Sequence, residues 1–345
     1  MSTNVGRYIG QFSPLIALSV GLLSGAVLML TSGVNPLVAY RDSFTILLQS
    51  PFKLGDIVVY AMPIMIIGVG LALAFKANFW NIGAEGQLWM GGLFATLVAL
   101  NLNTSAPIYF ILMLLAGFGG GCIWGLLPAL LKTRYGTSEI LVSMLMCPIA
   151  VLIVEFLLAG PLRDPVFLFN QTPLIPEAAR FSIIVPGTRI TVGILVALVC
   201  AVLAYVILNK TTLGYRIKCV GYGPKVAQTT GINVPKTLLS TMVISSGLSG
   251  IAGMTLVSGI HHRLLRGFSP GGGSFVGFWG YGYIAIAAAL LAKNNPLATI
   301  GTSLLFGFLT ALGYLMEAAA GVSRFVMIFV EAIVIICAVW LYKIR

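Results

Sequence analysis

The chain reads Asn81-Ile82-Gly83-Ala84-Glu85-Gly86-Gln87 between two long apolar runs, Asp56 to Phe75 and Leu88 to Leu102. A carboxylate, two amides and two glycines therefore occupy a position that the flanking residues predict to lie inside a membrane. Polar groups of this kind are costly in hydrocarbon unless they face a partner or water. The stretch accordingly indicates a functional site or a structural feature that holds the surrounding helices.

The composition is that of an integral membrane protein. Of 345 residues, 59% are hydrophobic and 8% are charged, which is more apolar surface than a soluble domain buries. Apolar runs of about 20 residues, enough to cross roughly 30 Å of hydrocarbon, recur along the chain. We predict an all-α polytopic membrane protein, one transmembrane domain over residues 1–345 with about ten transmembrane helices. The predicted spans are Pro14 to Gly33, Asp56 to Phe75, Leu88 to Leu102, Pro107 to Leu131, Ile140 to Ala159, Thr188 to Leu208, Leu238 to Val257, Gly280 to Ala292, Leu297 to Met316 and Phe325 to Tyr342.

The third and eighth predicted spans are short, which is typical of broken or re-entrant helices. The net charge of +11 does not indicate nucleic-acid binding, because the basic residues are scattered between apolar spans. Lys and Arg are more frequent on the side that carries both termini. The positive-inside rule therefore predicts that both termini are cytoplasmic.

Two extramembrane segments are long enough to have a role. The first, residues 160–187 (the outer loop), is rich in proline, which favours an ordered, extended cap over a flexible linker. In the second, residues 209–236 (the coupling loop), Pro224 suits a first helical turn and Gly231 a left-handed stop, so a helix of about two turns is expected between them. Anchored between two spans, this helix would be a rigid projection for docking into another protein. The alternative is a basic loop held by anionic lipid.

The motifs of several function classes are missing from the sequence. It contains no H-E-x-x-H, no G-x-S-x-G and no G-x-x-x-x-G-K-[ST] phosphate loop, so we predict that the chain is not an enzyme and does not hydrolyse ATP by that route. Its five cysteines include no C-x-x-C pair, and no metal site is expected. An ion-driven secondary transporter, which also uses broken helices and buried carboxylates, stays open as an interpretation.

Several segments resemble the permease subunits of ABC importers for nucleosides, simple sugars and related solutes, a group related to branched-chain amino acid permeases. The similarity covers nearly the whole chain and is greatest to the larger of the two permeases in nucleoside uptake systems. It is carried by Gly33 to Tyr40, Gly70 to Phe75, Asn81 to Gln87, Ser138 to Ile140, Gly160 to Pro165 and the loop ending in Gly231 to Val234. The chain departs from the family pattern at Cys147-Pro148 and in the segment Gly280 to Ala287.

The resemblance implies a type II ABC importer-like permease that translocates a nucleoside across the bacterial cytoplasmic (inner) membrane. A simple sugar such as ribose or galactose, a riboflavin-like solute and, outside the family, an ion-driven secondary transporter are the alternatives. The implied partners are a second, similar permease that forms a heterodimer, a cytoplasmic ABC ATPase and an extracytoplasmic substrate-binding protein. ATP and Mg would be bound by the ATPase, and this chain would hold no cofactor.

The resemblance also assigns roles to residues. The helix of the coupling loop is similar to the coupling helix that contacts the ATPase, and its residues are Pro224, Lys225, Val226, Ala227, Gln228, Thr229, Thr230 and Gly231. Candidate substrate-pathway residues are Asn81, Glu85, Gln87 and Trp89. Their amide and carboxylate groups suit a hydroxyl-rich solute, and Trp89 suits stacking on a base or sugar, or anchoring at the interface.

Helix geometry leaves the role of the candidate pathway residues open. If the helix starts at Ile82, Asn81 and Glu85 share one face and Gln87 points elsewhere. Glu85 would then either contact the solute or brace a broken helix. For the other membrane carboxylates internal bracing is expected; these are Glu139, Glu155, Glu317 and Glu331.

Overall fold

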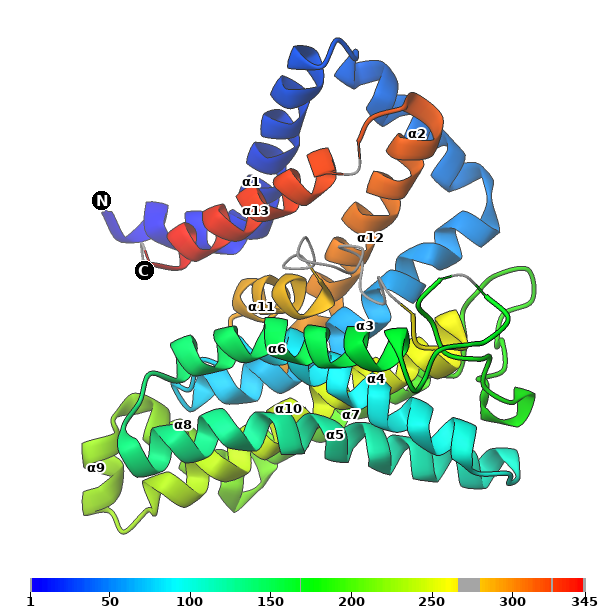
Figure 1. Ribbon diagram of the computed structural model, residues 1–345. Coiled ribbons are helices and arrows are strands. Elements are labelled where there is room, and N and C mark those ends of the chain that lie inside the picture. Colours follow the sequence, from blue (N-terminus) through cyan, green and yellow to red (C-terminus); the bar gives the residue numbers. More distant parts are fainter. Residues whose placement is uncertain (1, 168, 266–279, 324, 344–345) are drawn as a thin grey trace.

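A computed structural model describes residues 2–167, 169–265, 280–323 and 325–343, which are almost entirely helical (Figure 1). No strand is assigned within these ranges, where only two isolated β-bridges occur. The helices are α1 (Ser2–Thr31), α2 (Pro36–Gln49), α3 (Pro51–Lys76), α4 (Ala84–Asn101), α5 (Ala106–Tyr135), α6 (Glu139–Ala159), η1 (Glu177–Ala179), α7 (Gly193–Lys210), α8 (Thr212–Tyr222), α9 (Pro224–Thr229), α10 (Val234–Leu256), η2 (Val257–His261), α11 (Tyr281–Leu291), α12 (Pro296–Ala320) and α13 (Phe325–Lys343).

The predicted all-α membrane fold is confirmed, but the count of about ten spans is not. Among the described residues, six helices are long and apolar enough to cross a membrane, and up to seven if α1 and α2 form one bent span. The six are α3, α5, α6, α7, α10 with η2, and α12. The other predicted spans overlap α1, α4, α11 and α13. Of these, α11 is short, with 11 residues, and α4 carries Glu85 and Gln87 in its first turns.

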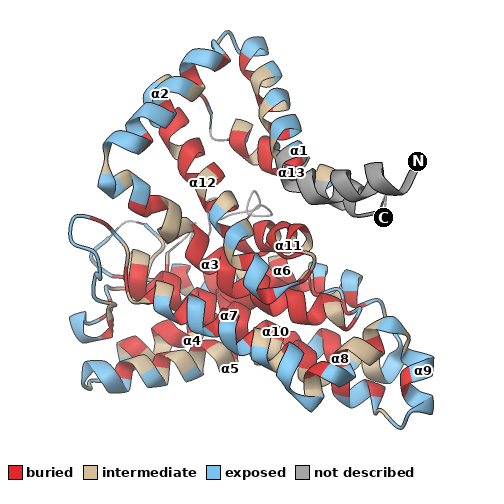
Figure 2. Ribbon diagram, turned by 180° about the vertical axis from the view of Figure 1, so that it is seen from behind, coloured by how far each residue is buried: buried red, intermediate tan, exposed pale blue. Residues whose placement is uncertain are grey.

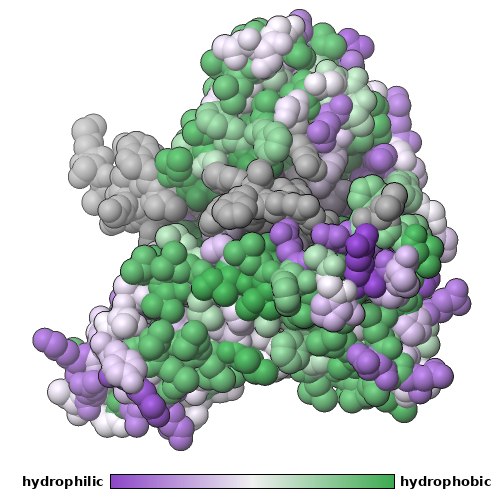
Figure 3. Space-filling view, in the orientation of Figure 1, coloured by the Kyte–Doolittle hydropathy of each residue, from purple (hydrophilic) through white to green (hydrophobic). Residues whose placement is uncertain are grey.

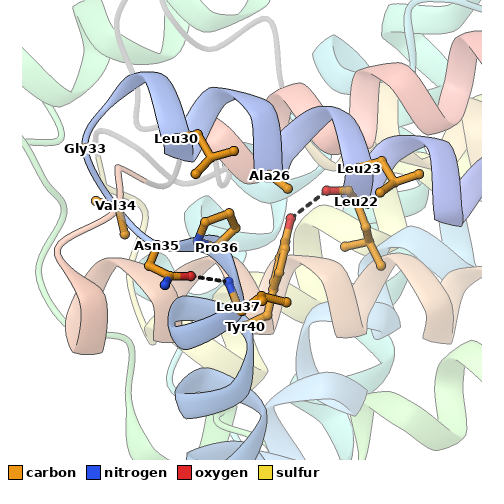
Figure 4. A pocket seen from close by; sticks show the side chains of 10 residues that line it. All are labelled: Leu22, Leu23, Ala26, Leu30, Gly33, Val34, Asn35, Pro36, Leu37 and Tyr40. Atoms are coloured by element: carbon orange, nitrogen blue, oxygen red, sulfur yellow. Dashed lines mark hydrogen bonds between the residues drawn. The ribbon is translucent and has the colours of Figure 1, made fainter.

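Helix α2 was not predicted from the sequence. It follows α1 after a break and the two are bent by 118° (Figure 1). The Asn35 side chain begins α2 by accepting a hydrogen bond from Leu37 N at 3.0 Å, and Tyr40 Oη donates back to Leu22 O at 2.9 Å (Figure 4). The inner side of the bend borders an open pocket of about 690 Å³ with an apolar lining. Its lining residues are Leu22, Leu23, Ala26, Leu30, Gly33, Val34, Asn35, Pro36, Leu37 and Tyr40.

The buried core lies where α3, α4, α10 and α11 meet, which is the red centre of Figure 2. Helices α5, α6 and α7 lie outside it and expose apolar side chains outward, such as Leu115, Phe156 and Val199. Figure 3 shows this apolar flank in green, with hydrophilic residues gathered at the two ends of the molecule. An apolar side surface between polar ends is the distribution that a bilayer requires.

The outer loop is ordered, as its proline content predicts. Its backbone amides donate to the segment after α10: Thr172 N to Leu264 O, Ile175 N to His262 O and Phe181 N to Ser258 O, each at 2.9 Å. At the other end of the molecule, the start of α1, the end of α13 and α9 all lie toward the same side, and α1 packs against α13 (Figure 1).

Candidate functional site

The polar stretch begins with a tight helix end. Helix α3 ends at Lys76, Asn78 adopts a left-handed conformation with φ of 55°, and Phe79 N donates to Ala74 O at 3.0 Å. This is the usual pattern for reversing the chain after a helix, in which asparagine tolerates the left-handed position. Asn81 then enters the core before α4 starts.

Helix α4 starts at Ala84 rather than Ile82, so the condition under which Asn81 and Glu85 would share one helix face is not met. Asn81 precedes the helix and turns toward Gln87, not toward the face of Glu85. The two amides are paired reciprocally: Asn81 Nδ2 donates to Gln87 Oε1, and Gln87 Nε2 donates to Asn81 Oδ1, both at 3.0 Å. Asn81 Oδ1 also accepts from Gly83 N at 3.1 Å, which fixes the turn into α4.

Two serines tie this turn to neighbouring helices. Asn81 Nδ2 donates to Ser245 Oγ of α10 at 3.2 Å, and Ile82 N donates to Ser143 Oγ of α6 at 3.2 Å. Asn81 and Gln87 are 0% and 1% exposed, so the bonds within the amide pair and to Ser245 form away from water. Buried amides left without partners would destabilise the bundle, whereas paired amides specify one packing arrangement.

The Glu85 side chain makes a hydrogen bond to a different helix, α11. Its Oε2 accepts from Gly282 N at 2.8 Å, and its Oε1 accepts from Trp89 Nε1 at 3.1 Å. Gly282 lies in the first turn of α11, where backbone amides have no partner within the helix. The carboxylate of α4 therefore caps α11, a favourable position for a negative charge because of the helix dipole.

The glycines of α11 make this capping contact possible. A Cβ atom on Gly282 would lie 2.4 Å from Glu85 N, and one on Gly280 would lie 2.1 Å from Glu85 Oε1. Distances this short require something to shift, and for Gly282 the neighbour is backbone. The segment Gly280 to Ala287 thus has glycine at both of these contacts with Glu85.

We call Asn81, Glu85, Gln87, Ser143 and Ser245 the polar node. It connects α4 with α6, α10 and α11, and the candidate pathway residue Trp89, 2% exposed, packs against it through Glu85. The sequence did not single out either serine, since hydroxyl side chains are common within membrane helices and carry no signal of their own. That the four candidate residues line the substrate pathway stays a prediction.

The coupling loop has the predicted helix. Helix α9 starts at Pro224 and ends at Thr229, and Gly231 has a φ of 78°. Ala227 is buried against Val220 of α8 and Val234 of α10, and Ile232 N donates to Ala227 O at 3.0 Å. A helix this short is stable only when packing holds it, and this small apolar cluster provides the packing. The opposite face is open, with Val226 68% exposed.

The other polar residues singled out in the sequence lie apart from the polar node. Glu139 pairs with Lys132 Nζ at 2.8 Å, and Glu331 accepts from Thr310 Oγ1 at 3.0 Å, as expected for internal bracing. Glu317 is exposed. Among the described residues, no group of three or more His, Cys, Asp or Glu side chains is arranged to hold a metal ion. The glycine run Gly271 to Gly273, for which the sequence leaves open a mobile outer loop or gate and an ordinary loop, lies outside the described residues.

Comparisons with known proteins assign the family. Residues 54–338 match the family described as "Branched-chain amino acid transport system / permease component". The glucose ABC transporter permease protein TsgB13 of Haloferax volcanii is 30% identical over 96% of this chain and 88% of its own length. The guanosine ABC transporter permease protein NupP of Bacillus subtilis is 30% identical over 96% and 94%. A second protein of that organism, the guanosine ABC transporter permease protein NupQ, is 27% identical over 74% and 79%. The chain therefore belongs to the family of branched-chain amino acid transport system permease components.

Proposed function

We propose that this chain is the permease subunit of an ATP-driven ABC importer that carries a nucleoside across the cytoplasmic membrane of a bacterium. The similarity to the guanosine permease NupP carries the proposal, because it extends over 96% of this chain and 94% of the relative. A function that depends on the whole transmembrane domain is best inferred from a relative that matches the whole domain.

A simple sugar is the second candidate solute. The glucose permease TsgB13 has the same 30% identity over the same 96% of this chain, although a smaller share of its own length is covered. Guanosine and glucose share hydroxyl groups on a ring but differ in the purine base. The two candidates are therefore separated by direct measurement of which solute is carried.

The proposed assembly contains a second, homologous permease, a cytoplasmic ATPase that binds ATP and Mg, and an extracytoplasmic binding protein. Two permeases of Bacillus subtilis, NupP and NupQ, are both similar to this chain, which supports a pair of unlike permeases. The exposed face of α9 supports an ATPase contact through Pro224 to Gly231, since a rigid helix that projects from a membrane domain is a suitable docking element.

In the proposed topology the chain crosses the membrane about ten times, with both termini on the cytoplasmic side. Each span predicted from the sequence overlaps a helix, and the ends of α1 and α13 lie toward the same side as α9, which supports this arrangement (Figure 1). The excess of Lys and Arg on that side gives the orientation.

For the polar node we propose a positioning role beside the pathway. Asn81, Glu85, Gln87 and Trp89 would hold α4, α10 and α11 in register while the solute passes, instead of binding it. Their burial and their mutual hydrogen bonds support this role over solute contact.

Uptake by the reconstituted complex tests the proposal. Proteoliposomes that contain this chain with its partner permease, ATPase and binding protein are supplied with radiolabelled guanosine or glucose, with and without ATP inside. We expect ATP-dependent guanosine uptake. Glucose uptake with no guanosine uptake would reassign the solute, and uptake driven by an ion gradient without ATP would contradict the importer class.

A further inference from the structure

Gly221, near the end of α8, lies directly against the C-terminal end of α3. A Cβ atom at this position would lie 1.9 Å from the carbonyl oxygen of Lys76 and 3.0 Å from its carbonyl carbon. Both neighbours are backbone atoms, so no change of side-chain rotamer relieves the overlap. The coupling loop therefore touches the transmembrane core through bare backbone, an approach that only glycine permits.

On the cytoplasmic-loop side, this contact is rigidly connected to α9. Gly223 N donates to Cys219 O at 3.2 Å and Ala227 N donates to Gly223 O at 2.9 Å, so the end of α8 continues into α9 without a flexible linker. The apolar cluster of Val220, Ala227 and Val234 holds the two helices together. A force on the exposed face of α9 therefore moves Gly221 with it.

On the core side, the contact is close to the polar node. Ala77 and Phe79 are 2% and 1% exposed, and Phe79 N donates to Ala74 O at 3.0 Å, so the chain between Lys76 and Asn81 is held against the end of α3. From Asn81 the hydrogen bonds to Gln87 and Ser245 lead into α4 and α10. From α4, Glu85 reaches the first turn of α11 at Gly282.

We propose that Gly221 is a positioning residue for transport, which passes movement of α9 through Lys76 and the polar node to the start of α11. The inference rests on the proposed function, because it assumes that an ATPase moves α9. Coupling between distant sites is carried by packed elements with discrete arrangements. This route consists of the backbone contact at Gly221, the short stretch of chain from Lys76 to Asn81, and the buried hydrogen bonds of the polar node.

The chain offers a matched control two residues away. A Cβ atom on Gly223 would meet only Val226, at 3.7 Å for the nearer atom, and the φ of 178° at Gly223 is extended backbone open to any residue. The variants Gly221→Ala and Gly223→Ala each add one methyl group to the same connection. Only the first forces α8 away from α3.

The experiment compares the two variants with the wild-type complex in proteoliposomes. The measured quantities are ATPase retained on purification, guanosine carried per ATP hydrolysed, and amide hydrogen exchange in α11 with and without ATP. For Gly221→Ala we expect normal ATPase retention, roughly tenfold less guanosine per ATP, and no ATP-dependent change of exchange in α11. Gly223→Ala should match the wild type in all three.

Three results would overturn the proposal: normal coupling in Gly221→Ala, loss of the ATPase from that variant, or a wild-type complex whose exchange in α11 does not respond to ATP. Loss of the ATPase would show that Gly221 is needed for folding only. Failure of the proposed solute is distinguished by the wild-type uptake, since the exchange measurement needs ATP but no guanosine.

Discussion

The polar node and the coupling loop are both polar regions of an apolar protein. They differ in whether their side chains make contacts inside the bundle or face outward. In the polar node, the amides of Asn81 and Gln87 are satisfied by each other and by Ser245 inside the bundle. In the coupling loop, only one face of α9 is buried, and Val226 projects outward. A polar sequence motif in a membrane protein can therefore hold helices together inside the bundle. An exposed apolar side chain on a rigid polar loop is instead suited to contact with another protein.

The largest effect is expected from Val226→Asp. A charge in the centre of the exposed face of α9 should remove the ATPase from the purified complex, because central apolar residues at interfaces typically contribute about 2–4 kcal/mol, roughly 30- to 1000-fold in affinity. Co-purification with the ATPase measures it. Thr212→Asp, which adds the same charge at the exposed start of α8, is the control and should retain the ATPase. If Val226→Asp co-purifies normally with the ATPase, α9 does not form the interface with the ATPase.

The next largest effect is expected from Glu85→Ala. The change leaves the buried donors Gly282 N and Trp89 Nε1 without this acceptor, at about 1–3 kcal/mol each. We expect a lower thermal unfolding temperature in detergent and a larger loss of uptake than of ATPase association. Glu85→Gln keeps one acceptor oxygen and should lose less of both. If Glu85→Ala transports normally, Glu85 has no positioning role.

A smaller effect is expected for the amide pair. Asn81→Ala, Gln87→Ala and the double variant form a thermodynamic cycle, and we expect a coupling free energy of roughly 1–2 kcal/mol between the two amides, since residues in one hydrogen-bond network are not additive. Thermal or denaturant unfolding of the purified chain gives the values. Strictly additive losses would show that the reciprocal pair adds no stability of its own.

The smallest effect is expected from protonation of His262, which should change the stability of the outer loop. Burial, together with the positive charge of Arg180, lowers the pKa of His262 below its ordinary value. The unfolded chain then binds a proton at a higher pH than the folded one, so the stability of the outer loop should fall as the pH decreases below about 6.5 and be unaffected above it. Limited proteolysis of residues 160–187 across this range measures it.

The control for this pH effect is His262→Asn. His262 has a φ of 55°, a left-handed conformation that asparagine tolerates better than most residues. The variant should keep the loop in place and lose the pH dependence. A pH dependence that persists in His262→Asn would assign it to another group.

Local sequence signals predicted the features that depend on neighbours along the chain. The apolar runs located helices because hydrocarbon forces the backbone to satisfy its own hydrogen bonds. Pro224 and Gly231 located α9. Proline restricts φ and glycine permits a left-handed φ, and neither property depends on tertiary contacts. By the same logic α2 is predictable, since Asn35 before Pro36 is a helix-start signal.

Other features were not predictable in this way. The start of α4 at Ala84 depends on the bonds that Asn81 makes to Gln87 and Ser245, so its position follows from packing. Hydropathy did not give the number of spans for a related reason. Helix α4 carries Glu85 and Gln87 in its first turns, and hydropathy does not show that these side chains have partners inside the bundle.

The sequence by itself determined that this protein is a helical membrane protein with an ordered outer loop and a short helix in its coupling loop. Composition, apolar periodicity and local turn chemistry suffice for that, since each acts over a few residues. Only the tertiary structure decided that Glu85 caps α11 at a residue 197 positions away and that Gly221 meets the end of α3. Contacts between distant segments depend on how all the helices pack together, and no local pattern encodes the distance between two backbones.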